Sequence, residues 1–226
     1  EKSAKFMFPK SVYEEKRYTL VKNGIDVERY TYNKKNREKV RAELGVQDKI
    51  VVGHVGRFVY QKNHDFILEV FSEFHKKCEN SVLLLVGEGE LFQKMKEKAQ
   101  CLKISDAVIF YGVTYDIPGM LQAMDMFIFP SRFEGLGIVA IEAQAAGLPT
   151  LCADTIVDEV DITSKFVRVH GWNLSDWANK MLSVLTSCDD RTACKDEVIK
   201  AGYDIRTTVE QLEKFYIESG NKRKGN

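Results

Sequence analysis

Apolar residues follow two different spacings along the chain. Short, continuous apolar runs predict buried strands, and segments with apolar residues every three or four positions predict amphipathic helices. The predicted strands cover residues 50–55, 82–86, 107–111, 126–129, 150–153 and 166–169. The predicted helices cover residues 32–44, 65–77, 91–99, 117–124, 172–185, 191–201 and 204–219, with one more between Gly135 and Gly147. This alternation favours an α/β fold, a Rossmann-like doubly wound parallel sheet with helices at its C-terminal end.

The two ends of the chain depart from this alternation. A short apolar run at residues 19–21 predicts one more strand, and Asn23-Gly24 after it suits a turn with positive backbone angles. The polar segment 220–226 is expected to be disordered. We therefore expect one domain at residues 19–219, preceded by a linker at residues 1–18.

One carboxylate stands out in the apolar stretch after the strand at 126–129. Between Gly135 and Pro149 the sole ionisable side chain is Glu142, and a carboxylate in such a helix is costly to bury unless hydrogen-bond donors meet it. Glu134 lies eight positions earlier, in the turn. The free N–H groups at the helix start lie between the two glutamates and favour an anion. The pair therefore predicts a ligand with a hydroxylated ring at each end and a pyrophosphate between them, such as a nucleotide-sugar.

The residues between the two glutamates offer main-chain groups to such a ligand. Gly135 and Gly137 lack a Cβ, so a ligand can approach the backbone closely. We expect the N–H groups around Leu136 to Val139 to contact the pyrophosphate.

A second candidate loop follows the strand at 50–55. It opens with Gly56 and carries Arg57 and Lys62 ahead of a helix whose expected N-cap is Asn63. In a doubly wound sheet this position places a ligand at the carboxyl edge of the strands. We expect both cations to reach that edge, and ordinary surface charge is the alternative.

Three further residues adjoin this loop. His54 lies in the strand and is interpreted as a packed residue rather than a base, while His64 is expected to help fix the helix start. Gly87 opens a glycine-rich turn after the strand at 82–86. A tight turn without a ligand is the alternative for Gly87.

Together these features resemble the donor-binding half of the retaining glycosyltransferases with the GT-B fold (glycosyltransferase family 4, or glycosyl transferases group 1). The resemblance extends from about residue 21 to about residue 216 and is closest to members of bacterial exopolysaccharide and capsule synthesis. It rests on Glu134, Gly135, Glu142, Ala143, Gly147, Leu148 and Pro149.

The resemblance implies a role for each candidate residue. Arg57 and Lys62 would hold the donor diphosphate and stabilise the leaving charge, Glu134 would bind hydroxyls of the transferred sugar, and Glu142 those of the ribose. The first three form the catalytic group. The donor-binding residues would be Gly56, Gly87, Ile109, Phe110, Tyr111, Gly135, Leu136, Gly137, Ile138 and Glu142. The backbone of residues 109–111 would read the nucleobase, although core packing is the alternative for these apolar residues.

The resemblance also implies a substrate, partners and a location. The donor would be a nucleoside diphosphate sugar, which we expect to be a UDP-sugar, and no metal or other cofactor is expected because no Asp-x-Asp stands in a metal-binding context. Family members carry an acceptor-binding domain ahead of this one. Residues 1–18 would therefore be its remnant, and a carbohydrate or lipid-linked acceptor would bind through that missing N-terminal domain. This chain alone would bind donor without transferring sugar. We expect a cytoplasmic protein, and the resemblance allows peripheral association of the longer protein with the inner face of the plasma membrane.

Composition narrows the classes further. The 226 residues include 33 basic and 33 acidic side chains, which argues against a nucleic-acid partner held mainly by charge. Five cysteines without a C-x-x-C pair favour reduced cytosolic thiols over zinc or disulfides. No apolar run approaches the roughly 18 residues that a membrane-spanning helix needs.

Four alternative functions share parts of this pattern. A sugar-nucleotide epimerase or a phosphorylase has the same architecture, but needs acid/base carboxylates facing the sugar or a pyridoxal-binding lysine. A nucleotide-sugar binding module without turnover belongs to another class and fits the same residues. A dinucleotide-dependent dehydrogenase is disfavoured because no G-x-G-x-x-G follows the first strand of the sheet.

Overall fold

The computed structural model describes residues 7–15, 18–185, 191 and 194–224. The chain divides into two compact units. One unit is Val27–Ala201, and the other combines Glu1–Asp26 with Gly202–Asn226. The first of these units lies within the domain expected at residues 19–219.

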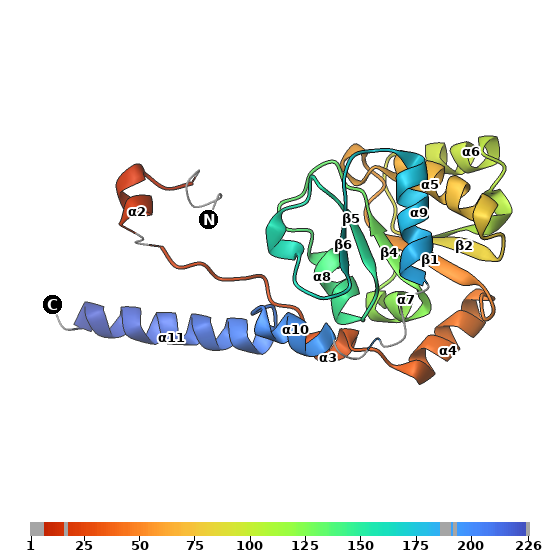
Figure 1. Ribbon diagram of the computed structural model, residues 1–226. Helices are drawn as coiled ribbons and strands as arrows, with labels where there is room; N and C mark the ends of the chain where they lie inside the picture. The colour runs from red at the N-terminus through yellow and green to blue at the C-terminus, as the bar shows by residue number, and fades with distance from the viewer. Residues whose placement is uncertain (1–6, 16–17, 186–190, 192–193, 225–226) are drawn as a thin grey trace. The chain divides into compact units, whose positions relative to one another are not determined.

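The larger unit is built on a six-stranded parallel sheet (Figure 1). Its strands are β1 (Ile50–Val55), β2 (Ser81–Val86), β3 (Val108–Gly112), β4 (Met126–Phe129), β5 (Thr150–Ala153) and β6 (Phe166–Val169). The order β3-β2-β1-β4-β5-β6 is that of a Rossmann-type doubly wound sheet. The predicted fold class is confirmed, and each of these strands lies within one residue of its prediction.

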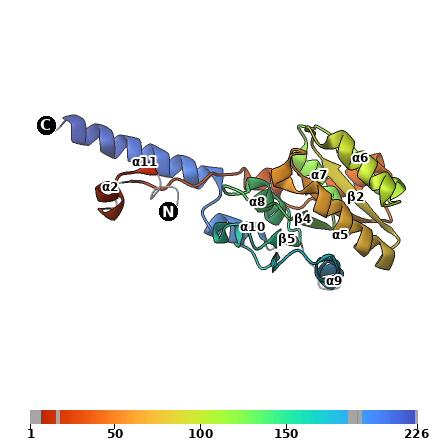
Figure 2. The ribbon, with the colours of Figure 1, turned by 90° about the horizontal axis from the view of Figure 1, so that it is seen from above.

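Helices cover both faces of this sheet (Figures 1 and 2). The helix α5 (His64–Lys77) packs against α6 (Phe92–Cys101) and α9 (Leu174–Leu185), and α4 (Lys34–Leu44) packs against α7 (Ile117–Ala123). The helix α8 (Ile138–Ala145) contacts α3 (Val27–Tyr30) and α10 (Cys194–Lys200). Three short 3-10 turns are η1 (Tyr60–Lys62), η2 (Ser105–Ala107) and η3 (Asp158–Val160).

The core forms where these helices meet the strands. Every residue of β2, β4 and β5 is buried, as expected for parallel strands covered on both faces. Trp177 of α9 is fully buried, and its indole N–H donates to the Gly171 carbonyl at 3.0 Å. Leu182 is partly buried against the same core. The inward orientation predicted for both residues is confirmed.

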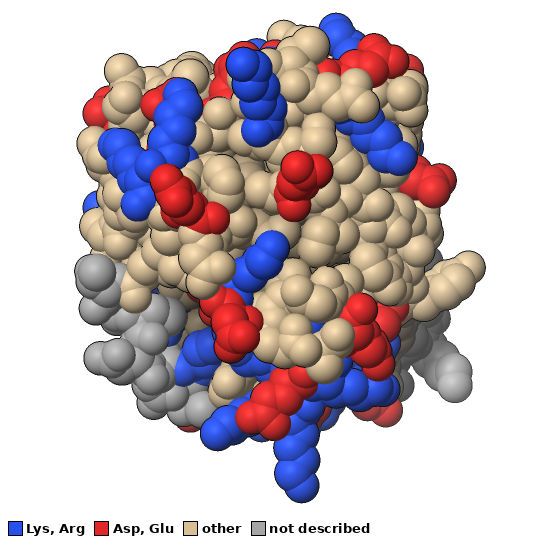
Figure 3. Space-filling view, turned by 90° about the vertical axis from the view of Figure 1, so that its right-hand side faces the viewer, with Lys and Arg blue, Asp and Glu red and all other residues tan. Residues whose placement is uncertain are grey.

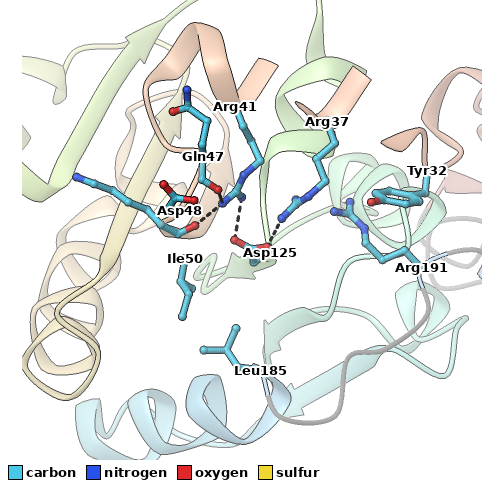
Figure 4. Close-up of a pocket in the computed structure, with 10 residues that line it drawn as sticks. Tyr32, Arg37, Arg41, Gln47, Asp48, Ile50, Asp125, Leu185 and Arg191 are labelled. Atoms are coloured by element: carbon cyan, nitrogen blue, oxygen red, sulfur yellow. Dashed lines mark hydrogen bonds and ion pairs between the residues drawn. The ribbon is translucent and has the colours of Figure 1, made fainter. Parts of the chain in front are cut away.

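A carboxylate immediately before β4 ties α4 to the sheet. Asp125 accepts hydrogen bonds from Arg37 at 2.5 Å, from Arg41 at 3.0 Å and from the Val51 backbone N–H at 2.7 Å. The two guanidinium groups also donate to carbonyls at the end of α7, including that of Ala123, which the helix itself leaves without partners. Figure 4 shows them converging from α4 on Asp125. These contacts fix one face of α4 to the sheet.

Arg37, Arg41 and Asp125 line a pocket of about 550 Å³ at the amino ends of the strands (Figure 4). A third arginine, Arg191, donates to the carbonyls of Gln122, Met124 and Ala146 and stacks over the Tyr32 ring at 4.5 Å. The arginines of this pocket therefore satisfy main-chain carbonyls.

The smaller unit corrects two predictions at the chain ends. The predicted strand at 19–21 is wrong, because the segment makes no strand and an isolated bridge pairs Ile25 with Asp204 instead. Neither residue of Asn23-Gly24 has a positive φ. Gly24 serves close approach, because a Cβ there would lie 2.6 Å from the Cα of Ile205.

Helices occupy parts of both terminal segments. The helix α2 (Lys10–Glu14) lies within the expected linker, of which residues 1–6 and 16–17 lie outside the described residues. The helix α11 (Ile205–Lys224) continues into the segment expected to be disordered, of which residues 225–226 lie outside the described residues.

Charges of both signs are interleaved on the face that lies at the right of Figure 1 (Figure 3). This face does not show the single-sign basic stripe that follows a nucleic-acid backbone. Among the helices that the structure describes, none has the length and apolar character needed to span a bilayer.

We predict that Asp125→Asn lowers the free energy of unfolding by about 2–4 kcal/mol, because it leaves two largely buried guanidinium groups without their counter-charge. Urea denaturation measures this change. Asp106→Asn, which changes an exposed carboxylate in η2, is the matched control and should shift stability by less than about 0.5 kcal/mol. Equal effects of the two substitutions would contradict the role of Asp125.

Candidate functional site

The loop after β1 is held against the turn after β2 by main-chain contacts. The Gly56 N–H donates to the Val86 carbonyl at 3.0 Å, and the Phe58 N–H donates to the Glu88 carbonyl at 2.9 Å. Gly87 has a φ of +135°, and a Cβ there would lie 2.2 Å from the Gly56 carbonyl oxygen. Glycine is therefore required at this contact, at the carboxyl ends of two neighbouring strands.

A groove of about 540 Å³ adjoins these contacts. It is lined by Val55, Gly56, Arg57, Val86, Gly87, Glu88, Gly89, Val113, Thr114 and Ile117. Arg57 is exposed, and its side chain makes no hydrogen bond or ion pair with the residues that the structure describes. An unpaired cation thus stands on the wall of a groove at the carboxyl edge of the sheet.

Lys62, the second cation of this loop, is already paired. Its Nζ lies 2.6 Å from Oε1 of Glu134 and 4.9 Å from the centre of the Phe129 ring. Gln61 donates to the other carboxylate oxygen at 3.1 Å and to the Phe133 carbonyl at 3.0 Å. The loops after β1 and β4 are therefore joined side chain to side chain at the edge where the strand order reverses.

Asn63 joins the same two loops in a way that differs from its predicted N-cap role. It occupies the N-cap position of α5 with a φ of +58°, but its side chain makes no capping hydrogen bond. Its Nδ2 instead donates to the Pro130 carbonyl at 3.1 Å.

The start of α8 presents a row of main-chain donors. The helix begins at Ile138, two residues later than expected, with Gly137 at its N-cap in the left-handed region. The N–H groups from Gly135 through Val139 make no hydrogen bond to described residues. A Cβ on Gly135 would meet nothing within 4 Å, so packing within the protein does not require glycine there. The N–H groups and the open space together suit an anion.

Glu142, within α8, is held by a residue of α3. Its Oε1 accepts a hydrogen bond of 2.8 Å from the Tyr30 hydroxyl. Burial raises the pKa of the Glu142 carboxyl above its ordinary value, and this hydrogen bond offsets part of the rise. The second oxygen has no partner among the described residues, so it can accept a hydrogen bond from a ligand.

Two histidines lie uncharged behind the loop. His54 is fully buried, as predicted, and its Nδ1 lies 2.9 Å from the Ile128 carbonyl. A carbonyl only accepts, so Nδ1 carries the proton. The His64 ring stacks on Phe58 at 3.9 Å and meets His54 edge-on at 4.9 Å. Desolvation is the largest cause that lowers the pKa of His54 to about 3 and that of His64 to about 2.

The expected nucleobase strand lies beside the groove rather than in its lining. Phe110 packs against Phe58 and Phe92, with ring centres 6.2 Å and 5.6 Å apart. Tyr111 is exposed and Ile109 is half-buried. Val113 and Thr114, which follow β3, line the groove instead.

Sequence reasoning missed three kinds of contact at this site. Tyr30 contacts Glu142 across 112 positions, and no local pattern signals that contact. Gln61 has no recognisable motif, although it stands beside Lys62. The lining residues Val113 and Ile117 follow a strand whose end could have indicated them.

No group of three or more His, Cys, Asp or Glu side chains that could hold a metal gathers within the described parts of the chain. Cys78, Cys101, Cys152 and Cys194 are not joined in disulfides, and Cys188 lies outside the described residues.

The fold is that found within the GT-B glycosyltransferases. The pattern that characterises the family described as Glycosyl transferases group 1 matches residues 36–200. The chain belongs to this family.

Two curated relatives show the extent of the likeness. EpsF of Bacillus subtilis (strain 168), whose name assigns it to the glycosyltransferases, is 31% identical over 226 residues, which cover 98% of this chain and 59% of EpsF. The UDP-Gal:alpha-D-GlcNAc-diphosphoundecaprenol alpha-1,3-galactosyltransferase of Escherichia coli is 26% identical over 215 residues, covering 88% of this chain and 54% of the enzyme. The chain therefore spans somewhat more than half the length of these relatives.

Solved structures show the same fold. HepE of Anabaena, solved with UDP and glucose, matches with a TM-score of 0.76 at 20% identity, over 88% of this chain and 56% of HepE. Its complex with UDP-glucose matches with a TM-score of 0.77 at 21% identity, over 88% and 57%.

We predict that the free energy of unfolding decreases as the pH is lowered below 6.5, because two histidines are buried in their neutral form. Their folded-state pKa values lie below the ordinary 6.5, so below pH 6.5 the unfolded chain binds protons that the folded protein does not. The stability that each neutral ring contributes is fully present above pH 6.5. It is lost progressively as the pH falls toward about 3 for His54 and about 2 for His64. Each ring contributes about 1.4 kcal/mol per pH unit, or about 2 kcal/mol between pH 6.5 and 5.

Urea denaturation across this pH range, compared between the wild type and His64→Phe, measures the effect. In the variant, the slope of the unfolding free energy against pH should be smaller by the contribution of one proton. Phe71→Leu changes the core without removing a titratable group and should keep the full slope. Identical slopes for the wild type and His64→Phe would contradict the prediction.

Proposed function

We propose that this chain is the donor-binding half of a retaining glycosyltransferase. It would hold a nucleoside diphosphate sugar, a UDP-sugar in our proposal, for transfer to a carbohydrate or lipid-linked acceptor in polysaccharide or exopolysaccharide biosynthesis. One observation carries the proposal, namely the position of the two cations of the loop after β1. Arg57 lines the groove without an ion pair to described residues, and Lys62 pairs with Glu134. Glu134 immediately precedes residues 135–139, whose N–H groups make no hydrogen bond to described residues.

The similar proteins support the choice of donor. The Escherichia coli relative is named for UDP-Gal, and HepE was solved with UDP and with UDP-glucose. In this proposal the groove takes the nucleoside, and Arg57 with the row of N–H groups takes the diphosphate.

The proposed mechanism uses positioning and charge rather than a protein nucleophile. As the bond between sugar and diphosphate breaks, negative charge develops on the leaving phosphate. Arg57, Lys62 and the α8 N-terminus stabilise that charge. Glu134 orients the sugar through its hydroxyls, and Glu142 orients the nucleoside through its ribose. A metal ion or other cofactor is not part of this proposal.

Acceptor binding belongs to the rest of the longer protein in this proposal. Transfer requires both reactants to be held together, and we propose that the acceptor half precedes this chain. The 226 residues alone would then bind donor without transferring sugar. We propose that the longer protein is cytoplasmic and that it can associate peripherally with the inner face of the plasma membrane.

We predict that Arg57→Ala weakens UDP binding by about 1.5–3 kcal/mol, because it removes a charge-assisted hydrogen bond to the diphosphate. Titration calorimetry measures the dissociation constant. Lys39→Ala removes an exposed cation from α4 and should leave UDP affinity unchanged. UDP binding that is insensitive to Arg57→Ala would remove this residue from the diphosphate site.

We further predict that Glu142→Gln weakens UDP binding and leaves inorganic pyrophosphate binding unchanged. The reason is that this carboxylate would accept hydrogen bonds from the ribose, which pyrophosphate lacks. The same calorimetric titration with both ligands is the measurement. Equal weakening of both would indicate that Glu142 acts through the packing of α8 against Tyr30.

A further inference from the structure

The pair formed by Lys62 and Glu134 is nearly closed to solvent. Its two charged groups lie 2.6 Å apart, and the side chains are only 17% and 7% exposed. Gln61 donates to the second carboxylate oxygen, so both oxygens of Glu134 already have a donor. The pair is electrically neutral as a unit.

Arg57 and Lys62 therefore differ in how available they are to an anion. The Arg57 guanidinium is exposed and makes no ion pair with described residues. An anion that approaches the Lys62 amine meets the Glu134 carboxylate at the same place. A bound anion and the Glu134 carboxylate would both lie within a few ångströms of the Lys62 amine. Two negative charges that close repel each other strongly where little water lies between them.

We propose that Glu134 is an internal competitor of the donor diphosphate for Lys62, and that this competition makes the site discriminate an intact sugar donor from the free nucleoside diphosphate. The inference rests on the proposed function. A sugar donor offers hydroxyl groups that replace the hydrogen bonds Glu134 loses when phosphate takes Lys62. A free diphosphate offers no such donors and leaves a carboxylate facing a phosphate.

The consequence concerns the turnover of the site. After transfer the sugar hydroxyls leave with the acceptor, so Glu134 loses its ligand partners while the diphosphate is still bound. Glu134 then recovers Lys62, and this exchange lowers the affinity for the product. The pair therefore favours release of the diphosphate over its retention.

A structural ion pair is the competing explanation, and the two differ in the sign of a mutational effect. If the pair only stabilises the loops, neutralising Glu134 loosens the site and weakens diphosphate binding. If Glu134 competes for Lys62, neutralising it strengthens diphosphate binding.

The test measures dissociation constants of inorganic pyrophosphate, UDP and UDP-glucose for the wild type, Glu134→Gln and Glu73→Gln. Glu73 pairs with Lys76 on the surface of α5, so the control makes the same chemical change away from the site. We expect Glu134→Gln to bind pyrophosphate and UDP about tenfold tighter and to lose much of its preference for UDP-glucose over UDP. The control should bind all three as the wild type does. Unchanged or weaker pyrophosphate and UDP binding by folded Glu134→Gln would overturn the inference.

A double variant keeps the test informative if Glu134→Gln does not fold. Lys62→Met combined with Glu134→Gln removes both charges at once. If Glu134 cancels Lys62 in the wild type, the double variant should bind pyrophosphate within about threefold of the wild type. A loss of more than about tenfold would show that Lys62 is free to bind phosphate and would overturn the inference.

The outcomes separate this inference from the proposed function. Absence of UDP binding by the wild type would contradict the proposed function. UDP binding that depends on Arg57 but is not strengthened by Glu134→Gln would contradict the inference alone.

Discussion

The parallel pairing of β1 with β4 is the contact on which the site depends. Its ladder is short and joins Val52 to Met126 and Gly53 to Phe127. Side chains extend it at both ends, since Asp125 accepts the Val51 N–H and His54 donates to Ile128. This pairing sets the two loops side by side, and without it Lys62 would have no reason to meet a residue 72 positions away.

The net charge at the site depends on two histidines that stay neutral as well as on the charged side chains. His54 and His64 lie next to Lys62, whose positive charge contributes to lowering the pKa of both rings. Both rings therefore stay neutral even in mildly acidic solution, and the loop after β1 presents two cations, Arg57 and Lys62. Since Glu134 offsets one of them, Arg57 supplies the unbalanced positive charge on this loop.

Much of the fold could be predicted from the sequence, because each strand is a buried apolar run that ends at a polar residue or glycine. The loops that carry Arg57 and Glu134 were located for the same reason. The pairing of Lys62 with Glu134 was not predicted, since each was assigned to a ligand and not to the other. Arg41 was missed because charged residues surround it in the sequence of α4, while in the fold it is buried against α7. These contacts depend on tertiary placement, which local periodicity does not encode.

The glycine contacts under the groove limit how the site can diversify. Part of the lining is main chain packed on main chain, where Gly87 meets Gly56, and a Cβ on Gly89 would lie 2.6 Å from the Phe58 carbonyl oxygen. A side chain at these glycines would break those contacts. If a nucleotide occupies the groove, a change in which base it accepts would have to arise at other lining residues, such as Val113, Thr114 and Ile117. Relatives with different nucleotide preferences should therefore vary at those three positions and share the glycines.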